Sequence, residues 1–192
     1  MPAQAAPASA VRQAGVEGPP YEHLGATERY LHETRDRAWR ALLRRHVIEG
    51  LTGRRILELG CGEGSLLRTL LRYGAGPERL EGIDIDSGKL ERARALVPGL
   101  KLAEGSIASL PYGDGAFDLA FAFTVFSSVL DAETRRSGAA EALRVLRPGG
   151  LLLLYDFWTN PLNRRVRPVS EHELRGMFAP RRIEIERVTL AP

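Results

Sequence analysis

Short apolar runs of strand length alternate along the chain with longer segments in which apolar residues recur every three or four positions. The first pattern is typical of buried strands, and the second is typical of helices that bury one face. The runs predict strands at 55–59, 80–85, 100–103, 117–123, 151–157 and 183–190. The periodic segments predict helices at 27–49, 65–72, 87–96, 132–146 and 170–178. Such an alternation with short connections predicts an α/β fold, a three-layer sandwich with helices on both faces of a mostly parallel sheet.

Local signals predict where some of these elements begin and end. Ser87 and Ser170 stand where N-caps are expected, and Ser170 with Glu173 forms a capping-box pattern. The run Pro148-Gly149-Gly150 is expected to break the helix before the strand at 151–157. That strand is apolar on both faces, so we expect it to be fully buried near the middle of the sheet.

The chain divides by composition into three parts. Residues 1–20 contain Ala, Pro, Gly and Gln with almost no large apolar residue, and such a segment cannot bury enough surface to offset its ordering entropy. We therefore expect a disordered tail at 1–20. Residues 21–53 are expected to form an N-terminal helical cap, and residues 54–192 are expected to form the main domain.

Composition also limits the partners and the location. The 192 residues suit one domain with a substantial core. Arginines supply nearly all of the 27 basic residues and are scattered among 24 acids, so we expect no nucleic-acid partner, which would require clustering on one face. No apolar run approaches the ~20 residues needed to span a bilayer, so no membrane partner is expected. The single cysteine, Cys61, fits a reducing compartment and no secretory signal is evident, so we expect a cytoplasmic protein.

The turn after the first predicted strand is the clearest candidate for a functional site. An apolar run that carries Glu58 breaks into Gly60, Gly62 and Gly64 before a helical pattern resumes. Glycines allow positive φ and a close approach of a ligand to the main chain, and the first N–H groups of the new helix are unpaired. This order predicts a nucleotide site. A dinucleotide-binding fingerprint would have its third glycine where Ser65 stands, so the spacing favours a ligand without a pyrophosphate.

With its neighbours, this turn resembles motif I of the class I S-adenosylmethionine-dependent methyltransferases, which have a Rossmann-like sheet. The resemblance extends over about 56–157 and rests on five stretches in the family's order. They are Glu58-x-Gly60-x-Gly62-x-Gly64, 80–86 (Leu-Glu-Gly-Ile-Asp-Ile-Asp), 105–111 (Gly-Ser-Ile, then Leu-Pro), 117–119 (Phe-Asp-Leu) and 143–150 (Leu-Arg-Val-Leu-Arg-Pro-Gly-Gly). The resemblance implies S-adenosylmethionine as the cofactor, methyl transfer as the activity, and 54–192 as the methyltransferase domain.

The resemblance also implies which residues bind the cofactor. Asp84 would take the two ribose hydroxyls with its carboxylate oxygens, and Ile85 would lie against the adenine. Ser106 stands where the family usually has an aspartate, so a hydroxyl would replace the carboxylate that accepts from the adenine amino group. No metal is expected. The full predicted set comprises Glu58, Gly60, Cys61, Gly62, Gly64, Asp84, Ile85, Ser106, Ile107 and Phe123.

The acceptor side carries fewer signals. A sulfonium donor is already activated, so alignment of the reacting atoms can supply several kcal/mol without an acid or base. The exit of the fourth strand, 123–128, is apolar and hydroxylated where many relatives place a histidine, so no base is assigned there. Beyond the fifth strand, Asp156, Asn160 and His172 are the candidates to orient or deprotonate the acceptor. We expect a small-molecule acceptor that is methylated at oxygen or nitrogen.

Two alternatives stay open, a nicotinamide-dependent oxidoreductase, which the glycine spacing disfavours, and a non-catalytic S-adenosylmethionine-binding or truncated subunit. The second arises because the family's sheet ends in antiparallel sixth and seventh strands, whereas this sequence stops at Pro192, just after the predicted sixth. A missing last strand would leave apolar strand edges open. We therefore expect a truncated product, or a homodimer in which a neighbouring chain covers the incomplete sheet edge.

Overall fold

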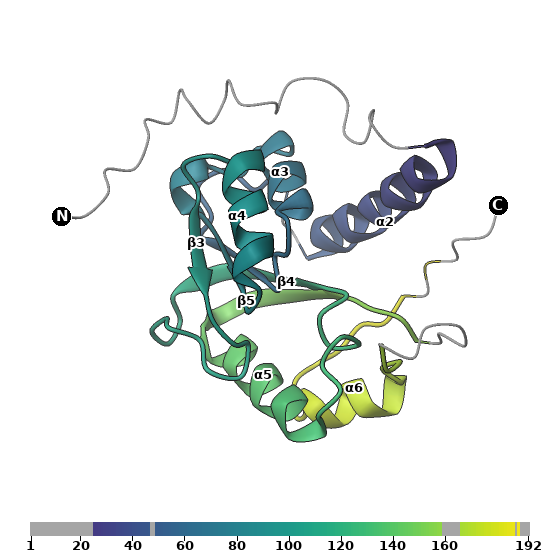
Figure 1. The fold of residues 1–192 in the computed structure, drawn as a ribbon. Helices are drawn as coiled ribbons and strands as arrows, with labels where there is room; N and C mark the ends of the chain where they lie inside the picture. Colours follow the sequence, from purple (N-terminus) through teal and green to yellow (C-terminus); the bar gives the residue numbers. More distant parts are fainter. Residues whose placement is uncertain (1–24, 47–48, 159–165, 187, 189–192) are drawn as a thin grey trace.

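A computed structural model describes residues 25–46, 49–158, 166–186 and 188 (Figure 1). The tail predicted at 1–20 and the candidate Asn160 lie outside the described residues. The helices are α2 (Ala26–Arg45), α3 (Ser65–Arg72), the 3-10 helix η1 (Pro77–Arg79), α4 (Ser87–Leu96), α5 (Ala132–Arg144) and α6 (Glu171–Met177). The strands are β1 (Ile56–Leu59), β2 (Leu80–Asp84), β3 (Lys101–Glu104), β4 (Phe117–Phe123) and β5 (Leu146–Tyr155).

The strands form one sheet in the order β3-β2-β1-β4-β5, and every neighbouring pair is parallel. Figure 1 shows α3 and α4 on one side of this sheet and α5 and α6 on the other. The predicted α/β sandwich with a Rossmann-like sheet is therefore confirmed. The chain leaves β1 toward β2 and β3 and then returns to the opposite side as β4. Open sheets of this kind bind ligands beyond the carboxyl ends of the strands at such a reversal.

Apolar side chains alternate between the two faces of the sheet and fill two core clusters. Ile56 and Phe121 belong to the cluster on the α3 and α4 side, whereas Leu57 and Ala122 belong to the cluster on the α5 side. Helix α2 completes the first cluster, because the ring of Trp39 meets the ring of Phe121 edge-on at a centroid distance of 5.6 Å. The N-terminal helix thus packs over the part of the sheet that α3 and α4 leave uncovered.

Strand β5 differs from its prediction. It lies at an edge of the described sheet instead of near the middle, and among its residues only Leu153 is buried. Pro148-Gly149-Gly150 does not separate a helix from the strand but lies inside β5, where a register shift carries 147–150 past β4. An apolar run indicates burial only if a neighbour covers it, and the pattern of one strand carries no information about that neighbour.

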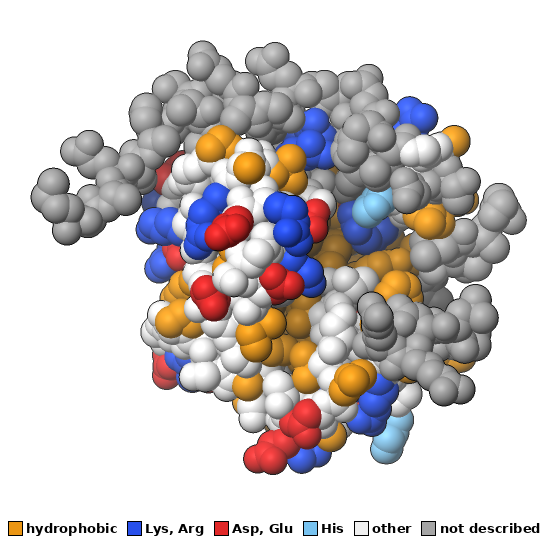
Figure 2. All heavy atoms as spheres, in the orientation of Figure 1, with side chains coloured by type: hydrophobic (Ala, Val, Ile, Leu, Met, Phe, Trp, Pro, Cys, Tyr) orange, Lys and Arg blue, Asp and Glu red, His pale blue; other side chains and the backbone are white. Residues whose placement is uncertain are grey.

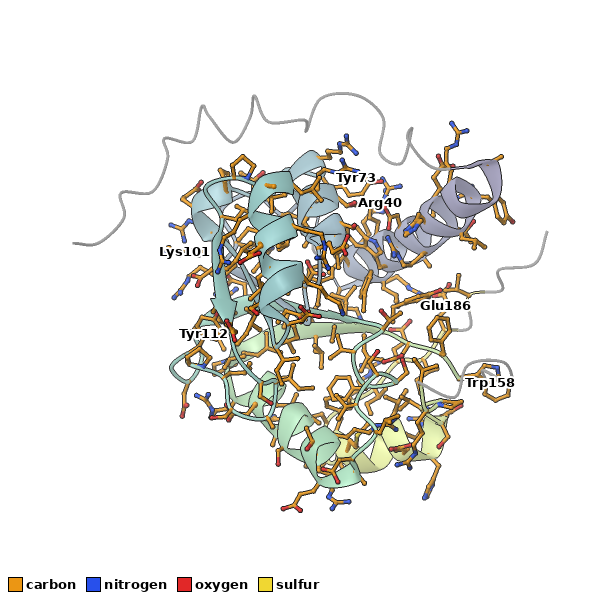
Figure 3. All side chains as sticks on the ribbon, viewed as in Figure 1. Arg40, Tyr73, Lys101, Tyr112, Trp158 and Glu186 are labelled. Atoms are coloured by element: carbon orange, nitrogen blue, oxygen red, sulfur yellow. The ribbon has the colours of Figure 1, made fainter. Side chains whose placement is uncertain are left out.

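The last predicted strand is also corrected. Residues 183–186 of the predicted strand 183–190 have no strand structure, and 187 and 189–190 lie outside the described residues. Ile183 packs instead against the core cluster on the α5 side. Glu184 then reaches the end of α2, where its carboxylate lies 3.2 Å from both Arg45 and His46. Figure 3 shows the neighbouring Glu186, which also pairs with Arg45, beside this helix.

The helix starts are partly as predicted. Ser170 caps α6 by accepting the Glu173 backbone N–H at 3.1 Å, which confirms the cap. Ser87 is not the cap of α4, because Asp86 accepts the Lys89 backbone N–H at 3.0 Å and Ser87 is the first helical residue. Within the described residues, no helix combines the length and apolarity that a membrane crossing requires.

Candidate functional site

The glycine turn between β1 and α3 lies at the carboxyl end of the central strand. Gly60 has φ +62°, and a Cβ there would lie 2.6 Å from Cγ2 of Val125, so the exit of β4 presses directly on the turn. Gly62 has φ +51°, and a Cβ there would meet no atom within 4 Å. Both positions require a residue that tolerates the left-handed region. The turn is therefore closed on the β4 side at Gly60 and open at Gly62.

Glu58 is a buried carboxyl group beneath this turn. Its side chain points to the face of the sheet that carries Phe121, and the residue is only 4% exposed. The backbone N–H of Leu67, in the first turn of α3, donates to it, whereas its Oε2 has no hydrogen-bond partner in the described structure. Burial raises the pKa of Glu58 well above its usual range, and the positive charge of Arg35 opposes part of that rise. An unpaired buried carboxylate oxygen of this kind is costly unless a ligand satisfies it.

Asp84 ends β2 beside the same turn. Its Oδ2 accepts the Gly62 backbone N–H at 2.8 Å, and its Oδ1 accepts the Asp86 backbone N–H at 2.9 Å. A carboxylate offers about four acceptor positions, so each oxygen retains capacity for a further donor. The next residue, Ile85, is 74% exposed although it is large and apolar. An anchored carboxylate and an exposed apolar side chain therefore stand together at the rim of the turn.

Other predicted residues point elsewhere. Cys61 is buried with its Sγ close to Gly82, and burial raises the pKa of its thiol, so it packs and does not act as a nucleophile. Ile107 is buried against Gly138 of α5, so its side chain belongs to the core. Ser106 accepts the Ala108 backbone N–H at 3.2 Å with its hydroxyl oxygen. Its own hydroxyl proton is still available to a ligand.

The exit of β4 has an unusual backbone. Thr124 has φ +57°, the one non-glycine residue with positive φ among those described. A β-branched residue in this region is strained, and such strain persists only where its surroundings impose it. The Thr124 backbone N–H donates to the Tyr155 carbonyl at 2.7 Å, and the Ser128 hydroxyl donates to the Thr124 carbonyl at 2.7 Å. Two exposed hydroxyl residues thus follow Phe123 at the strand's carboxyl end.

The three acceptor candidates are not gathered into one group. Asp156 is half-buried, and its two carboxylate oxygens accept the backbone N–H groups of Ser127 and Phe157, each at 3.0 Å. It therefore fixes the loop after β4 to the end of β5. His172 lies exposed near the start of α6, and Asn160 is outside the described residues. Burial also raises the pKa of Asp156.

Sequence reasoning missed the contribution of α2. The guanidinium carbon of Arg35 lies 5.2 Å from the ring centroid of Phe123 and 6.0 Å from that of Tyr155. Arg35 also pairs with Asp36, a fully buried acid that accepts the indole N–H of Trp39 at 3.0 Å. The sequence showed only one arginine among many on an amphipathic helix. The adjacent charged residues Arg35 and Asp36, beside the apolar face of the helix, were the only feature of the sequence that could have indicated this contact.

Apolar side chains gather in the middle of the view in Figure 2, between the region of α4 and that of α5 and α6. Among the described residues, no three His, Cys, Asp or Glu side chains lie close enough together to hold a metal ion. The arrangement offers carboxylates, backbone N–H groups and apolar surface, and it suits a nucleoside with a cationic group.

Comparisons with known proteins agree with this chemistry. A family model described as "Methyltransferase domain" matches residues 56–150. A "Probable S-adenosylmethionine-dependent methyltransferase" of Mycolicibacterium smegmatis is 35% identical over 107 residues, which are 53% of this chain and 37% of that protein. A demethylmenaquinone methyltransferase of Clavibacter sepedonicus is 32% identical over 130 residues, which are 66% of this chain and 50% of that protein.

A solved structure is similar as well. It is that of CalS10 with S-adenosylmethionine bound, an amino pentose methyltransferase of Micromonospora echinaspora. It is 26% identical with a TM-score of 0.56, and the match covers 74% of this chain and 59% of that one. The chain spans half or less of the length of the two curated relatives. The matched segment contains β1 to β4, the glycine turn, Glu58 and Asp84, whereas α2 lies before it.

Proposed function

Because this chain belongs to the class I S-adenosylmethionine-dependent methyltransferase family, we propose that it transfers the methyl group of S-adenosylmethionine to a small-molecule acceptor. The observation that carries the proposal is the site at the ends of β1 and β2. An open glycine turn lies there between a buried carboxylate with one unpaired oxygen and a second carboxylate held by the turn itself. Both carboxylates belong to the segment that matches the family.

The residues of this site fit S-adenosylmethionine group by group. The remaining acceptor positions of Asp84 suit the two ribose hydroxyls, which are donors. The exposed side chain of Ile85 offers apolar contact to the adenine, whose transfer out of water would be favourable. The unpaired Oε2 of Glu58 suits the ammonium group. Ser106 can donate but, with its oxygen already accepting a backbone N–H, is a weaker acceptor for the adenine amino group.

S-adenosylmethionine supplies an activated methyl group on a sulfonium sulfur. The chain must therefore bind the donor, align it with the acceptor and exclude water from the reacting atoms. The close contact between Gly60 and Val125 fixes the distance between the glycine turn and the β4 exit. A donor bound at the turn and an acceptor bound at the β4 exit would therefore be held at a fixed separation. The hydroxyl protons of Thr124 and Ser128 are donated to backbone carbonyls, so their oxygens can accept a hydrogen bond from a polar group of the acceptor there. Asp156 supports this loop through its bond to Ser127 and serves as a positioning residue.

The acceptor is proposed to be a small molecule methylated at oxygen or nitrogen. Two similar proteins are named for acting on small molecules, demethylmenaquinone and an amino pentose, and this supports a small acceptor. Oxygen or nitrogen as the methylated atom stays a prediction. His172 and Asn160 stay predictions for proton transfer or orientation. We further propose a homodimer, supported by the position of β5 at the edge of the sheet that the described residues form. A cytoplasmic location also stays a prediction.

Two experiments test the function in sequence. Calorimetric titration of the full chain with S-adenosylmethionine, S-adenosylhomocysteine and NAD separates a methyl donor site from a nicotinamide site. A methyl-transfer screen with labelled S-adenosylmethionine against small phenols, amines, sugars and carboxylates then follows. We expect binding of the first two ligands and transfer to at least one acceptor class. Binding without transfer to any class would support the non-catalytic subunit instead, and binding of NAD alone would support the oxidoreductase.

A further inference from the structure

The loop between β4 and α5 connects the glycine turn with the helices on the other face of the sheet. At its start Val125 lies against Gly60, and Thr124 and Ser128 are the residues proposed to meet the acceptor. The loop then runs to α5, which packs beside α6 (Figure 1). The way in which this loop is held therefore decides where the acceptor lies relative to the donor.

One arginine of α5 holds this loop from the inside. Arg135 is fully buried, and three nitrogens of its guanidinium donate to three different segments. Nε donates to the Val129 carbonyl in the loop, Nη2 to the Arg167 carbonyl before α6 at 2.9 Å, and Nη1 to the Glu173 carboxylate of α6 at 2.9 Å. A guanidinium carries its five N–H donors in a rigid planar fork, so these bonds fix the three segments relative to one another.

A further hydrogen bond closes a ring through the loop. The Arg167 backbone N–H donates to the Ser127 carbonyl at 2.8 Å, so Arg167 is bound to the loop both directly and through Arg135. The Ser127 backbone N–H donates in turn to Asp156, which follows β5, at 3.0 Å. The middle of the loop is therefore held on one side by the end of β5 and on the other by the segment before α6.

A buried cation at this place gives the core direction as well as stability. Glu173 is the carboxylate partner of Arg135, and the same oxygen lies 3.5 Å from Nη2 of Arg167. Replacing a buried ion pair by well-packed apolar residues is often neutral for stability, because both charges lose their hydration. Each N–H of the guanidinium, in contrast, fixes the direction of one acceptor oxygen, which an apolar side chain cannot do. The ion pair therefore specifies one arrangement of the loop.

We propose that Arg135 is a positioning residue for methyl transfer, which holds the loop after β4 where Thr124 and Ser128 meet the acceptor. The inference rests on the proposed function, because it takes the chain to transfer a methyl group to an acceptor at this loop. The fully buried Arg135 acts through Val129 and Arg167 and touches neither donor nor acceptor. A misplacement of the reacting groups by about 1 Å can lower the rate about 100-fold.

The test compares Arg135→Lys with Arg144→Lys in the full chain. Lysine keeps the positive charge but carries its donors on a flexible stem, so it cannot hold three segments at fixed angles. Arg144, at the other end of α5, is the matched control, because its guanidinium also donates to two backbone carbonyls and to carboxylates. Those carbonyls, of Leu110 and Tyr112, belong to the segment before β4 and not to the loop after it.

Two measurements on each chain separate positioning from folding. Calorimetry with S-adenosylhomocysteine counts the molecules with an intact donor site, and labelled S-adenosylmethionine with the fastest acceptor of the methyl-transfer screen gives kcat/KM per intact site. We expect Arg135→Lys to lower kcat/KM per site about 10- to 100-fold and to bind S-adenosylhomocysteine within about twofold of the original chain. Arg144→Lys should leave both values unchanged. A purely structural role for Arg135 would lower the number of intact sites without changing kcat/KM per site, and that result would overturn the proposal.

Native-state hydrogen exchange of the original chain covers the case in which Arg135→Lys fails to fold. The backbone N–H groups of Ser127 and Arg167 lie outside helices and strands, but both belong to the ring. We expect both to exchange at least about 100-fold more slowly than in an unfolded chain. Exchange of either group at the rate of an unfolded chain would overturn the proposal, because the loop would not be held. If the original chain transferred methyl groups to no acceptor class, the proposed function itself would fall, whereas transfer that is insensitive to Arg135→Lys would overturn only the role of Arg135.

Discussion

Replacing Gly60 by alanine probes the contact between the glycine turn and the β4 exit. The new Cβ would lie 2.6 Å from Cγ2 of Val125, at a residue with φ +62°. A residue with a Cβ costs about 1–2 kcal/mol in the left-handed region. An extra methyl group in a well-packed site costs about 1–3 kcal/mol. Together these terms lower the free energy of unfolding by about 2–5 kcal/mol.

Gly62→Ala is the matched comparison, two residues away in the same turn. Its φ of +51° imposes the same backbone penalty, but its Cβ would meet nothing within 4 Å. We therefore expect a loss of only about 1–2 kcal/mol. Its methyl group would instead enter the open side of the turn, so S-adenosylhomocysteine should bind more weakly. The two alanines thus separate a packing requirement from a ligand requirement.

Urea unfolding followed by circular dichroism measures both losses, provided that the slope with denaturant stays unchanged between variants. The packing at Gly60 would be refuted by a loss below about 1 kcal/mol for Gly60→Ala, or by equal losses for the two variants. Titration with S-adenosylhomocysteine completes the comparison. Full affinity in Gly62→Ala would show that the open side of the turn does not face the donor.

Three further predictions concern polar groups that are fully or partly buried. Because burial raises the pKa of Glu58 above that of the unfolded chain, its stabilising contribution is present at acidic pH and is lost as pH rises through the raised value. Near neutral pH, Glu58→Gln should therefore have a higher melting temperature than the original chain, and this difference should vanish below about pH 4.5. A difference in melting temperature that is the same at all pH values would contradict this expectation. Arg135 is fully buried and donates to Glu173 at 2.9 Å and to the Val129 carbonyl. Arg135→Met should therefore lower the free energy of unfolding by about 3–5 kcal/mol in urea titrations. A loss under about 1 kcal/mol would mean that these hydrogen bonds do not stabilise the fold. Asp156→Asn leaves only one accepting oxygen for two backbone N–H groups. The free energy of unfolding should therefore fall by about 1–3 kcal/mol in urea titrations. An unchanged urea midpoint would mean that these hydrogen bonds contribute nothing to stability.

The sequence was sufficient to predict the parts of the fold that rest on local patterns. Helix α3 has the predicted bounds, and β4 does also, because each is a continuous apolar pattern that ends at a clear signal. The predicted N-cap of α4 was wrong by one residue. Asp86 and Ser87 are both residues that cap helices well, so the sequence alone does not distinguish between them. The predicted position of β5 in the sheet was wrong, because whether a strand lies at an edge or in the centre depends on its neighbours, which come from other parts of the chain.

The candidate site shows the same division. Gly60, Gly62, Glu58 and Asp84 follow one another at family spacing, so their order along the chain was enough to bring them together at one site. Arg35 could not be found in this way. Its place over the strand ends depends on how α2 crosses the sheet, and Trp39 packing against Phe121 sets that crossing. Contacts between elements distant in sequence leave no periodicity to detect.

Calorimetric titration with S-adenosylhomocysteine of the original chain and of Asp84→Ala measures whether the ends of β1 and β2 bind the methyl donor. The Asp84 carboxylate is proposed to accept hydrogen bonds from the ribose hydroxyls, which are worth about 1.5–3 kcal/mol at a charged acceptor. We predict saturable binding by the original chain at one site, weakened about 10- to 150-fold in Asp84→Ala. No binding by the original chain, or the same affinity in both chains, would show that the methyl donor does not bind at the ends of these two strands.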